Sequence, residues 1–271
     1  MRSFLLVALL PAALCAATTL QIVKPIVSQT DGGDADAPGF EHVAGETLYF
    51  SCRVEGFAKS EEKVHLTYSV QAFDPKGVAL AEIYKNAILE EVLPQDKDWA
   101  PKIETEVEVP PLAPPGEYKI VVKAEDFYAN TSAELPVTFR VRGLRVDASD
   151  KLVVRNFGFY RGEDDAQALA RPIFHNGANL WAKWDITGYK YGPNNKVDIS
   201  WTVSILQGEK VLKAFDSASE QSESIYPKPW VPASFEVPLQ KVAVGEYTIL
   251  VRVKDVTGAQ TYETRHNFTV E

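Results

Sequence analysis

The chain has 271 residues, of which 45% are hydrophobic and 24% are charged, and its formal net charge at pH 7 is −9. This length accommodates two ordinary domains, and the balance of apolar and charged residues excludes a disordered or fibrous chain. The negative charge argues against nucleic acid or an anionic membrane surface as a partner, because both attract basic patches.

The first residues have the layout of a secretory signal peptide. Arg2 precedes an unbroken apolar run from Phe4 to Leu14, and small residues follow up to Ala17. The run is shorter than the roughly 20 apolar residues that span a bilayer, and no other apolar stretch approaches that length, so no membrane span is expected. We expect cleavage after Ala17, which would remove residues 1–17 and send the mature chain to the periplasm or outside the cell.

Cys15 offers an alternative, in which it carries a bacterial lipid anchor. The residue before it is Leu14, where such a site prefers Gly, Ala or Ser, so cleavage after Ala17 is the favoured interpretation. That cleavage leaves Cys52 as the single cysteine of the mature chain, and the fold then has no disulfide framework.

The first part of the mature chain alternates hydrophobic and polar residues with a period of two. This alternation predicts strands at 48–54, 64–70, 103–109, 116–124 and 137–141. Cys52 falls on the apolar face of the first of these strands, which predicts a buried core side chain rather than a reactive thiol. No segment has a clear helical period, and Pro and Gly separate the strands at short spacing, so a sandwich is favoured over an α/β fold.

Much of this pattern occurs a second time. The stretch GEYKIVVKAED at 116–126 returns as GEYTILVRVKD at 245–255, 129 positions later. Further predicted strands of the second copy lie at 180–186, 197–203, 231–237 and 268–270. A repeat of this length exceeds the periods of about 20 to 50 residues in solenoids, so it predicts two whole domains from a duplication. We expect these domains at 18–142 and 152–271, joined by a linker at 143–151.

The sequence LAPPGEYKIVVKA at 112–124 resembles the strand-E to strand-F corner of fibronectin type III and related immunoglobulin-like modules, where a Leu, a turn Gly and a Tyr recur. The second copy keeps Leu239, Gly245 and Tyr247. This resemblance implies that the hydroxyl of Tyr118 bonds back to the backbone upstream. It also implies an all-β fold with two homologous antiparallel immunoglobulin-like β-sandwiches in tandem after the signal peptide, an arrangement common in exported bacterial proteins.

Two loops concentrate carboxylates beside glycine. TDGGDADAPG contains Asp31, Asp34 and Asp36, and RGEDDAQ contains Glu163, Asp164 and Asp165. Calcium takes six to eight oxygen ligands, so such loops are candidate calcium sites. Their spacing does not match the 12-residue EF-hand loop, and acidic loops are commonly just solvated. Calcium is the only cofactor that the sequence suggests.

Aromatic residues are the candidate binding surface. Trp99 and Trp230 recur in matching contexts, DKDWAPK and PKPWVPA, and Trp181, Tyr189 and Tyr191 make the second domain rich in aromatics. Exposed aromatics make efficient binding platforms, whereas a Trp that recurs in both copies is also what capping each core would require.

No hydrolase, phosphate-loop or dinucleotide motif occurs, so no enzymatic activity is expected. We expect an exported binding or structural module that contacts another protein at the cell envelope. One alternative is a carbohydrate-binding module with a polysaccharide partner. It requires that the aromatics form one exposed flat strip on the surface of the protein. Another is a duplicated sandwich-type protease inhibitor, which requires a stiff exposed loop at 110–115 or 226–232. A cleft between the domains could also assemble an active site from distant residues.

Overall fold

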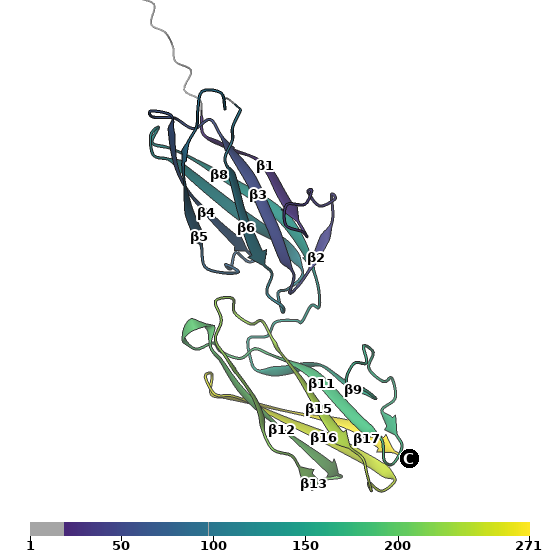
Figure 1. The fold of residues 1–271 in the computed structure, drawn as a ribbon. Helices are drawn as coiled ribbons and strands as arrows, with labels where there is room; N and C mark the ends of the chain where they lie inside the picture. Colours follow the sequence, from purple (N-terminus) through teal and green to yellow (C-terminus); the bar gives the residue numbers. More distant parts are fainter. Residues whose placement is uncertain (1–18, 97) are drawn as a thin grey trace, which may run out of the picture.

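The computed structural model describes residues 19–96 and 98–271, so the predicted signal peptide and Cys15 lie outside the described residues. We call residues 19–142 the first half and residues 152–271 the second half; the two lie end to end (Figure 1). Apart from one 3₁₀ turn at Pro193–Asn195, the regular structure that is described consists of strands. None of the described residues forms a helix with the length and hydrophobicity needed to cross a bilayer.

The described residues of the first half form eight strands. They are β1 (Gln21–Ser28), β2 (Glu41–Val43), β3 (Thr47–Glu55), β4 (Lys63–Phe73), β5 (Tyr84–Glu91), β6 (Lys102–Glu108), β7 (Gly116–Asp126) and β8 (Thr131–Arg142). A three-stranded sheet in the order β1-β3-β6 and a five-stranded sheet in the order β2-β8-β7-β4-β5 enclose one hydrophobic core.

The second half contains nine strands. They are β9 (Val153–Tyr160), β10 (Ile173–Phe174), β11 (Asn179–Thr187), β12 (Val197–Gln207), β13 (Lys210–Ala214), β14 (Ala218–Ser222), β15 (Val231–Pro238), β16 (Gly245–Asp255) and β17 (Gln260–Val270). The sheet β15-β11-β9 faces the sheet β10-β17-β16-β12-β13, in which β14 also pairs with β12. A separate hydrophobic core lies between them.

The predicted all-β fold with antiparallel sheets is confirmed, with one qualification in each half. The short strands β2 and β10 run parallel to β8 and β17, respectively. Each short strand follows a loop that carries the chain from one sheet to the edge of the other, so it arrives in the same direction as its neighbour. The predicted strands omit β1, β2, β5, β9, β10, β13 and β14. Of these, β5 and β13 are exposed strands with almost no buried face and therefore little alternation.

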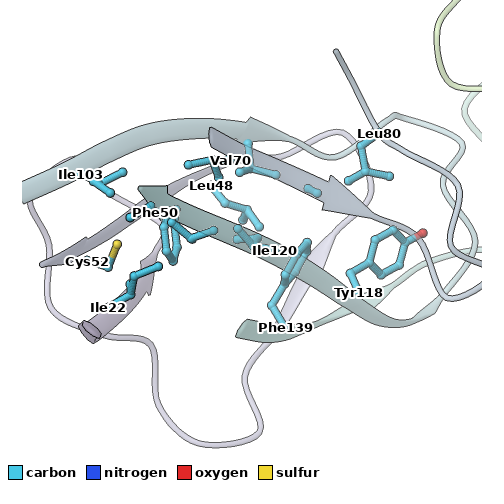
Figure 2. Packing of buried hydrophobic residues seen from close by; sticks show 14 of the residues in the cluster. Ile22, Leu48, Phe50, Cys52, Val70, Leu80, Ile103, Tyr118, Ile120 and Phe139 are labelled. Atoms are coloured by element: carbon cyan, nitrogen blue, oxygen red, sulfur yellow. The ribbon is translucent and has the colours of Figure 1, made fainter. Parts of the chain in front are cut away.

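The side chains predicted to point inward form the cores. Figure 2 shows Phe50 and Cys52 of β3 facing Ile120 of β7 across the first core. In the second half, Ala182 and Trp184 of β11 are likewise buried. Cys52 is only 1% exposed, which confirms that it is a core side chain.

One end of each core is closed by a tyrosine whose hydroxyl bonds back to the preceding loop. Tyr118 donates to the carbonyl of Pro114 at 2.6 Å, and Tyr247 donates to the carbonyl of Ala243 at 2.7 Å. Figure 2 shows the Tyr118 hydroxyl at one end of the core of the first half. These are the corner hydrogen bonds that the resemblance implied.

The opposite end of each half is held by a buried aspartate at the end of the same strand. Asp126 of β7 accepts hydrogen bonds from the backbone N–H groups of Ala58 and Tyr128. Asp255 of β16 accepts hydrogen bonds in the same way from Lys190 and Gly258. The two halves therefore fasten the turn after this strand to a second loop with equivalent hydrogen bonds.

We expect Tyr118→Phe to lower the free energy of unfolding by about 1–2 kcal/mol, because the substitution leaves the part-buried carbonyl of Pro114 without a donor. Urea unfolding of the mature chain, followed by circular dichroism, measures the change. Tyr49→Phe is the matched control, because Tyr49 lies half-buried on the outer face of β3. Equal stability of Tyr118→Phe and the control would contradict this role for the hydroxyl.

We also expect Cys52 to resist alkylation in the folded protein. Burial raises the pKa of its thiol to about 12. At pH 8 only about one thiol in 10⁴ is then ionised, against roughly a quarter at an ordinary thiol pKa, and the thiolate is the nucleophile. Iodoacetamide labelling followed by mass spectrometry should give negligible modification in buffer and complete modification in urea. Rapid labelling without denaturant would contradict the assignment.

Candidate functional site

The acidic residues of the first half do not converge on one point. Asp31 and Asp34 are exposed and line a groove of about 540 Å³ over the outer face of the β1-β3-β6 sheet. Asp36 turns away to the buried His42, whose Nε2 lies 3.2 Å from its Oδ2. The Nδ1 atom of His42 lies 3.5 Å from a carboxylate oxygen of Glu46. Asp36 therefore packs against β2 rather than completing a set of oxygen ligands with its neighbours.

The acidic loop of the second half follows β9. Glu163, Asp164 and Asp165 are all exposed there, and the carboxylate of Asp165 accepts hydrogen bonds from the backbone N–H groups of Arg161 and Gly162. Across residues 19–96 and 98–271, no group of three His, Cys, Asp or Glu side chains is arranged to hold a metal ion. Calcium binding stays a prediction from the sequence.

The aromatic residues predicted as a binding surface do not form one exposed strip. Trp230 and Tyr189 are buried, at 4% and 6% exposure, whereas Trp181 is half-buried and Tyr191 is 40% exposed. Trp99, in the first half, is half-buried and packs against its core. Because Trp230 and Tyr189 are buried, the aromatics of the second half do not form the exposed flat strip that the carbohydrate-binding alternative requires.

Tyr226, Asp74 and Tyr118 form a joint between the two halves. Tyr226 belongs to the loop between β14 and β15, yet its side chain, 8% exposed, packs with the core of the first half. Its hydroxyl donates to Oδ2 of the buried Asp74 at 3.1 Å. The Oδ1 atom of Asp74 accepts hydrogen bonds from the backbone N–H groups of Lys76 and Val78. The carboxylate of Asp74 thus holds the turn after β4 and also accepts a hydrogen bond from the second half.

The loop that carries Tyr226 is held from its own half. The hydroxyls of Tyr189 and Tyr191 both donate to the carbonyl of Lys228, at 2.5 and 2.6 Å. The side-chain amide of Asn195 donates to the carbonyls of Ser224 and Ile225. Tyr189 and Tyr191, which the sequence predicted as binding residues, therefore hold the loop that carries Tyr226.

The joint is electrostatically distinct. Burial is the larger cause and the nearby Asp74 carboxylate the next, and together they raise the pKa of the Tyr226 hydroxyl far above its ordinary value. The same two causes raise the pKa of Tyr118. Both hydroxyls therefore keep their protons, which makes Tyr226 a lasting donor to Asp74.

The joint also bears on the inhibitor alternative, because both of its candidate loops lie at this junction. In the loop at 110–115, Ala113 is buried and the carbonyl of Pro114 accepts from Tyr118. In the loop at 226–232, Tyr226 and Trp230 are buried. Neither loop is the exposed, stiff segment that a sandwich-type inhibitor requires.

The outer end of the first half carries an exposed aromatic cluster, which we call the aromatic tip and define as His65, Phe127 and Tyr128. Phe127 is 69% exposed and Tyr128 is 40% exposed. The Phe127 ring stacks on His65 with centroids 4.6 Å apart, and Tyr128 stands nearly perpendicular to both rings. Two backbone N–H groups of this turn, those of Tyr128 and Ala129, are fixed by the carboxylate of Asp126.

The binding surface predicted from the sequence consists of Trp99 and four aromatics of the second half, and it does not include the tip. The signal was present at Phe127 and Tyr128, two aromatics in a hairpin turn where small polar residues are usual. The joint had no local signal, because Tyr226 and Asp74 are 152 residues apart.

No protein-family model matches this chain, and no curated protein matches it. Red sea bream transglutaminase is similar over 94% of this chain and 31% of its own, with 9% identity and a TM-score of 0.30. The C-terminal domain of the Streptococcus agalactiae AgI/II polypeptide BspA is similar over 92% of this chain and 100% of its own, with 10% identity and a TM-score of 0.31.

We expect Tyr226→Ala to uncouple the two halves, because it removes both the buried ring and the donor to Asp74. ¹⁵N relaxation should then give shorter and unequal rotational correlation times for the halves, where the unaltered protein gives one common value. Tyr49→Ala removes a tyrosine remote from the joint and is the control. Unchanged correlation times in Tyr226→Ala would contradict the joint.

Proposed function

We propose that this chain is a non-catalytic, exported binding module that contacts another protein at the cell envelope through the aromatic tip. The observation that carries the proposal is the exposure of Phe127 and Tyr128 on a turn fixed by Asp126. Aromatic side chains dominate the energetics of protein interfaces, and a turn that is already ordered loses little entropy on binding.

The geometry of the tip favours a protein over a polysaccharide. Rings that stack on successive sugars must present one flat strip. Here the Phe127 and Tyr128 rings meet at 76°, so they are not coplanar. The ring of His65 stacks on one face of the Phe127 ring. Perpendicular rings instead suit an irregular apolar surface of the kind found at protein interfaces.

The arrangement of the two halves is consistent with this role. β7 carries Tyr118 near its first residue and Asp126 at its last, so the joint and the tip lie at opposite ends of the first half. We propose that the halves are tandem immunoglobulin-like domains from a duplication, exported by cleavage of residues 1–17. The second half would then hold the tip away from its point of attachment.

Co-sedimentation with insoluble cell envelope from the native host tests this function. The tagged mature chain should sediment with untreated envelope and remain in solution after the envelope has been digested with protease. Sedimentation that survives digestion would replace the protein partner with a polysaccharide. Absence of sedimentation with untreated envelope would contradict an envelope-binding role.

We expect Phe127→Asp to weaken sedimentation at least tenfold, because truncation of an aromatic hot spot costs about 2 kcal/mol or more. Val256→Asp is the matched control, because Val256 is 48% exposed and occupies the equivalent turn of the second half. The N–H of Val256 donates to the backbone carbonyl of Asp198, and the N–H of Phe127 donates to the backbone carbonyl of His65. A titration of envelope against fixed protein gives the apparent affinities. An equal loss in both variants would exclude a specific contact at the tip.

A further inference from the structure

The far end of the second half contains an open counterpart of the place that Tyr226 fills in the first half. The equivalence follows from strand register. β4 pairs Phe73 with Lys119, and β12 pairs Leu206 with Thr248. Asp74 follows Phe73, and Gln207 follows Leu206. The corner tyrosines Tyr118 and Tyr247 directly precede Lys119 and Thr248, respectively. Asp74 with Tyr118 and Gln207 with Tyr247 therefore occupy equivalent positions.

In the first half this position is filled. The Tyr226 ring lies in the core, and its hydroxyl reaches Asp74 beside Tyr118. Leu80, which follows the residue paired with Phe73, is only 5% exposed. The end of the first core is thus covered by an aromatic side chain from outside its own sandwich.

In the second half the same position is a pocket of about 300 Å³, which we call the distal pocket. It is lined mainly by apolar side chains, including Leu212, Phe215, Leu239, Val242 and Tyr247, with Gln207 among the polar ones. Leu212 follows the residue paired with Leu206, as Leu80 follows the residue paired with Phe73, and it is 46% exposed. Exposed apolar pockets with a few polar groups commonly mark binding sites, so the distal pocket is a candidate site for a side chain from outside this sandwich.

We propose that the distal pocket receives a tyrosine side chain from a loop of a protein partner, as the first half receives Tyr226. Gln207 occupies the position equivalent to Asp74, and its side-chain carbonyl oxygen accepts the hydrogen bond of the incoming hydroxyl. Lys213 and Lys241 also line the pocket, so an acidic residue beside the partner's tyrosine adds charge complementarity. This inference rests on the proposed function in one respect, namely that the partner is a protein.

In a second copy of this chain, the loop equivalent to the Tyr226 loop has no tyrosine at the matching position. The loop of the first half that corresponds to the Tyr226 loop ends at Trp99, as the latter ends at Trp230. Four residues before Trp99 the chain has Gln95, where the second half has Tyr226. Head-to-tail stacking that repeats the geometry of the joint would therefore place Gln95 at the pocket in the position of Tyr226. We accordingly take a different protein as the occupant.

p-Cresol, the side chain of tyrosine as a free molecule, is the probe for the pocket. We expect saturable shifts of the Leu212, Leu239 and Val242 methyl signals in spectra of the methyl-labelled mature protein. In Tyr226→Ala the Leu80 methyls should also shift, because that variant opens the equivalent position in the first half. Absence of shifts at the three distal methyls, with Leu80 responding in Tyr226→Ala, would overturn the proposal.

Envelope co-sedimentation tests whether the partner uses the pocket. Leu212→Asp places a charge at its mouth and Val242→Trp fills it, whereas Leu89→Asp alters a residue of β5 that is 66% exposed and remote from it. We expect the two pocket variants to sediment at least tenfold more weakly than Leu89→Asp, while their methyl spectra in the first half stay unchanged. Sedimentation equal to that of the control would overturn the pocket and leave the aromatic tip as the contact. Failure of the unaltered protein to sediment would instead overturn the proposed function and this inference with it.

Discussion

A buried hydroxyl or carboxylate must find its partner inside the protein, and this constraint organises both halves. Tyr118 and Tyr247 satisfy it by bonding back to the loop that precedes them. Asp126 and Asp255 satisfy it by accepting backbone N–H groups from two loops at once. Because an unpaired polar group in a core costs several times what a paired one contributes, these bonds fix both ends of each sandwich.

The joint extends the same constraint across the two halves. Asp74 already accepts two backbone N–H groups of its own turn, and the Tyr226 hydroxyl completes its surroundings. The ring of Tyr226 meanwhile covers apolar residues that would otherwise meet water. Apolar contact and a hydrogen bond to a carboxylate therefore act together in the one side chain of Tyr226.

Aromatic residues have opposite roles at the two ends of the first half. At the joint they are buried, with Tyr189 and Tyr191 bracing the loop that holds Tyr226. At the outer end Phe127 and Tyr128 are exposed on a fixed turn. Composition alone does not separate these roles, since the same ring stabilises a core or offers a binding surface according to what covers it.

The sequence by itself determined the features that depend on neighbours along the chain. Alternation located β3, β4, β6, β7 and their counterparts and placed Cys52 in the core, because strand period is local. The resemblance of residues 112–124 to the corner of immunoglobulin-like modules implied the corner tyrosines. Alternation did not locate β5, whose exposed face lacks it. Only the tertiary structure decided that Trp230 is buried, that Tyr226 meets Asp74 and that the distal pocket is open, because burial and contact between residues far apart in sequence depend on how finished sheets pack.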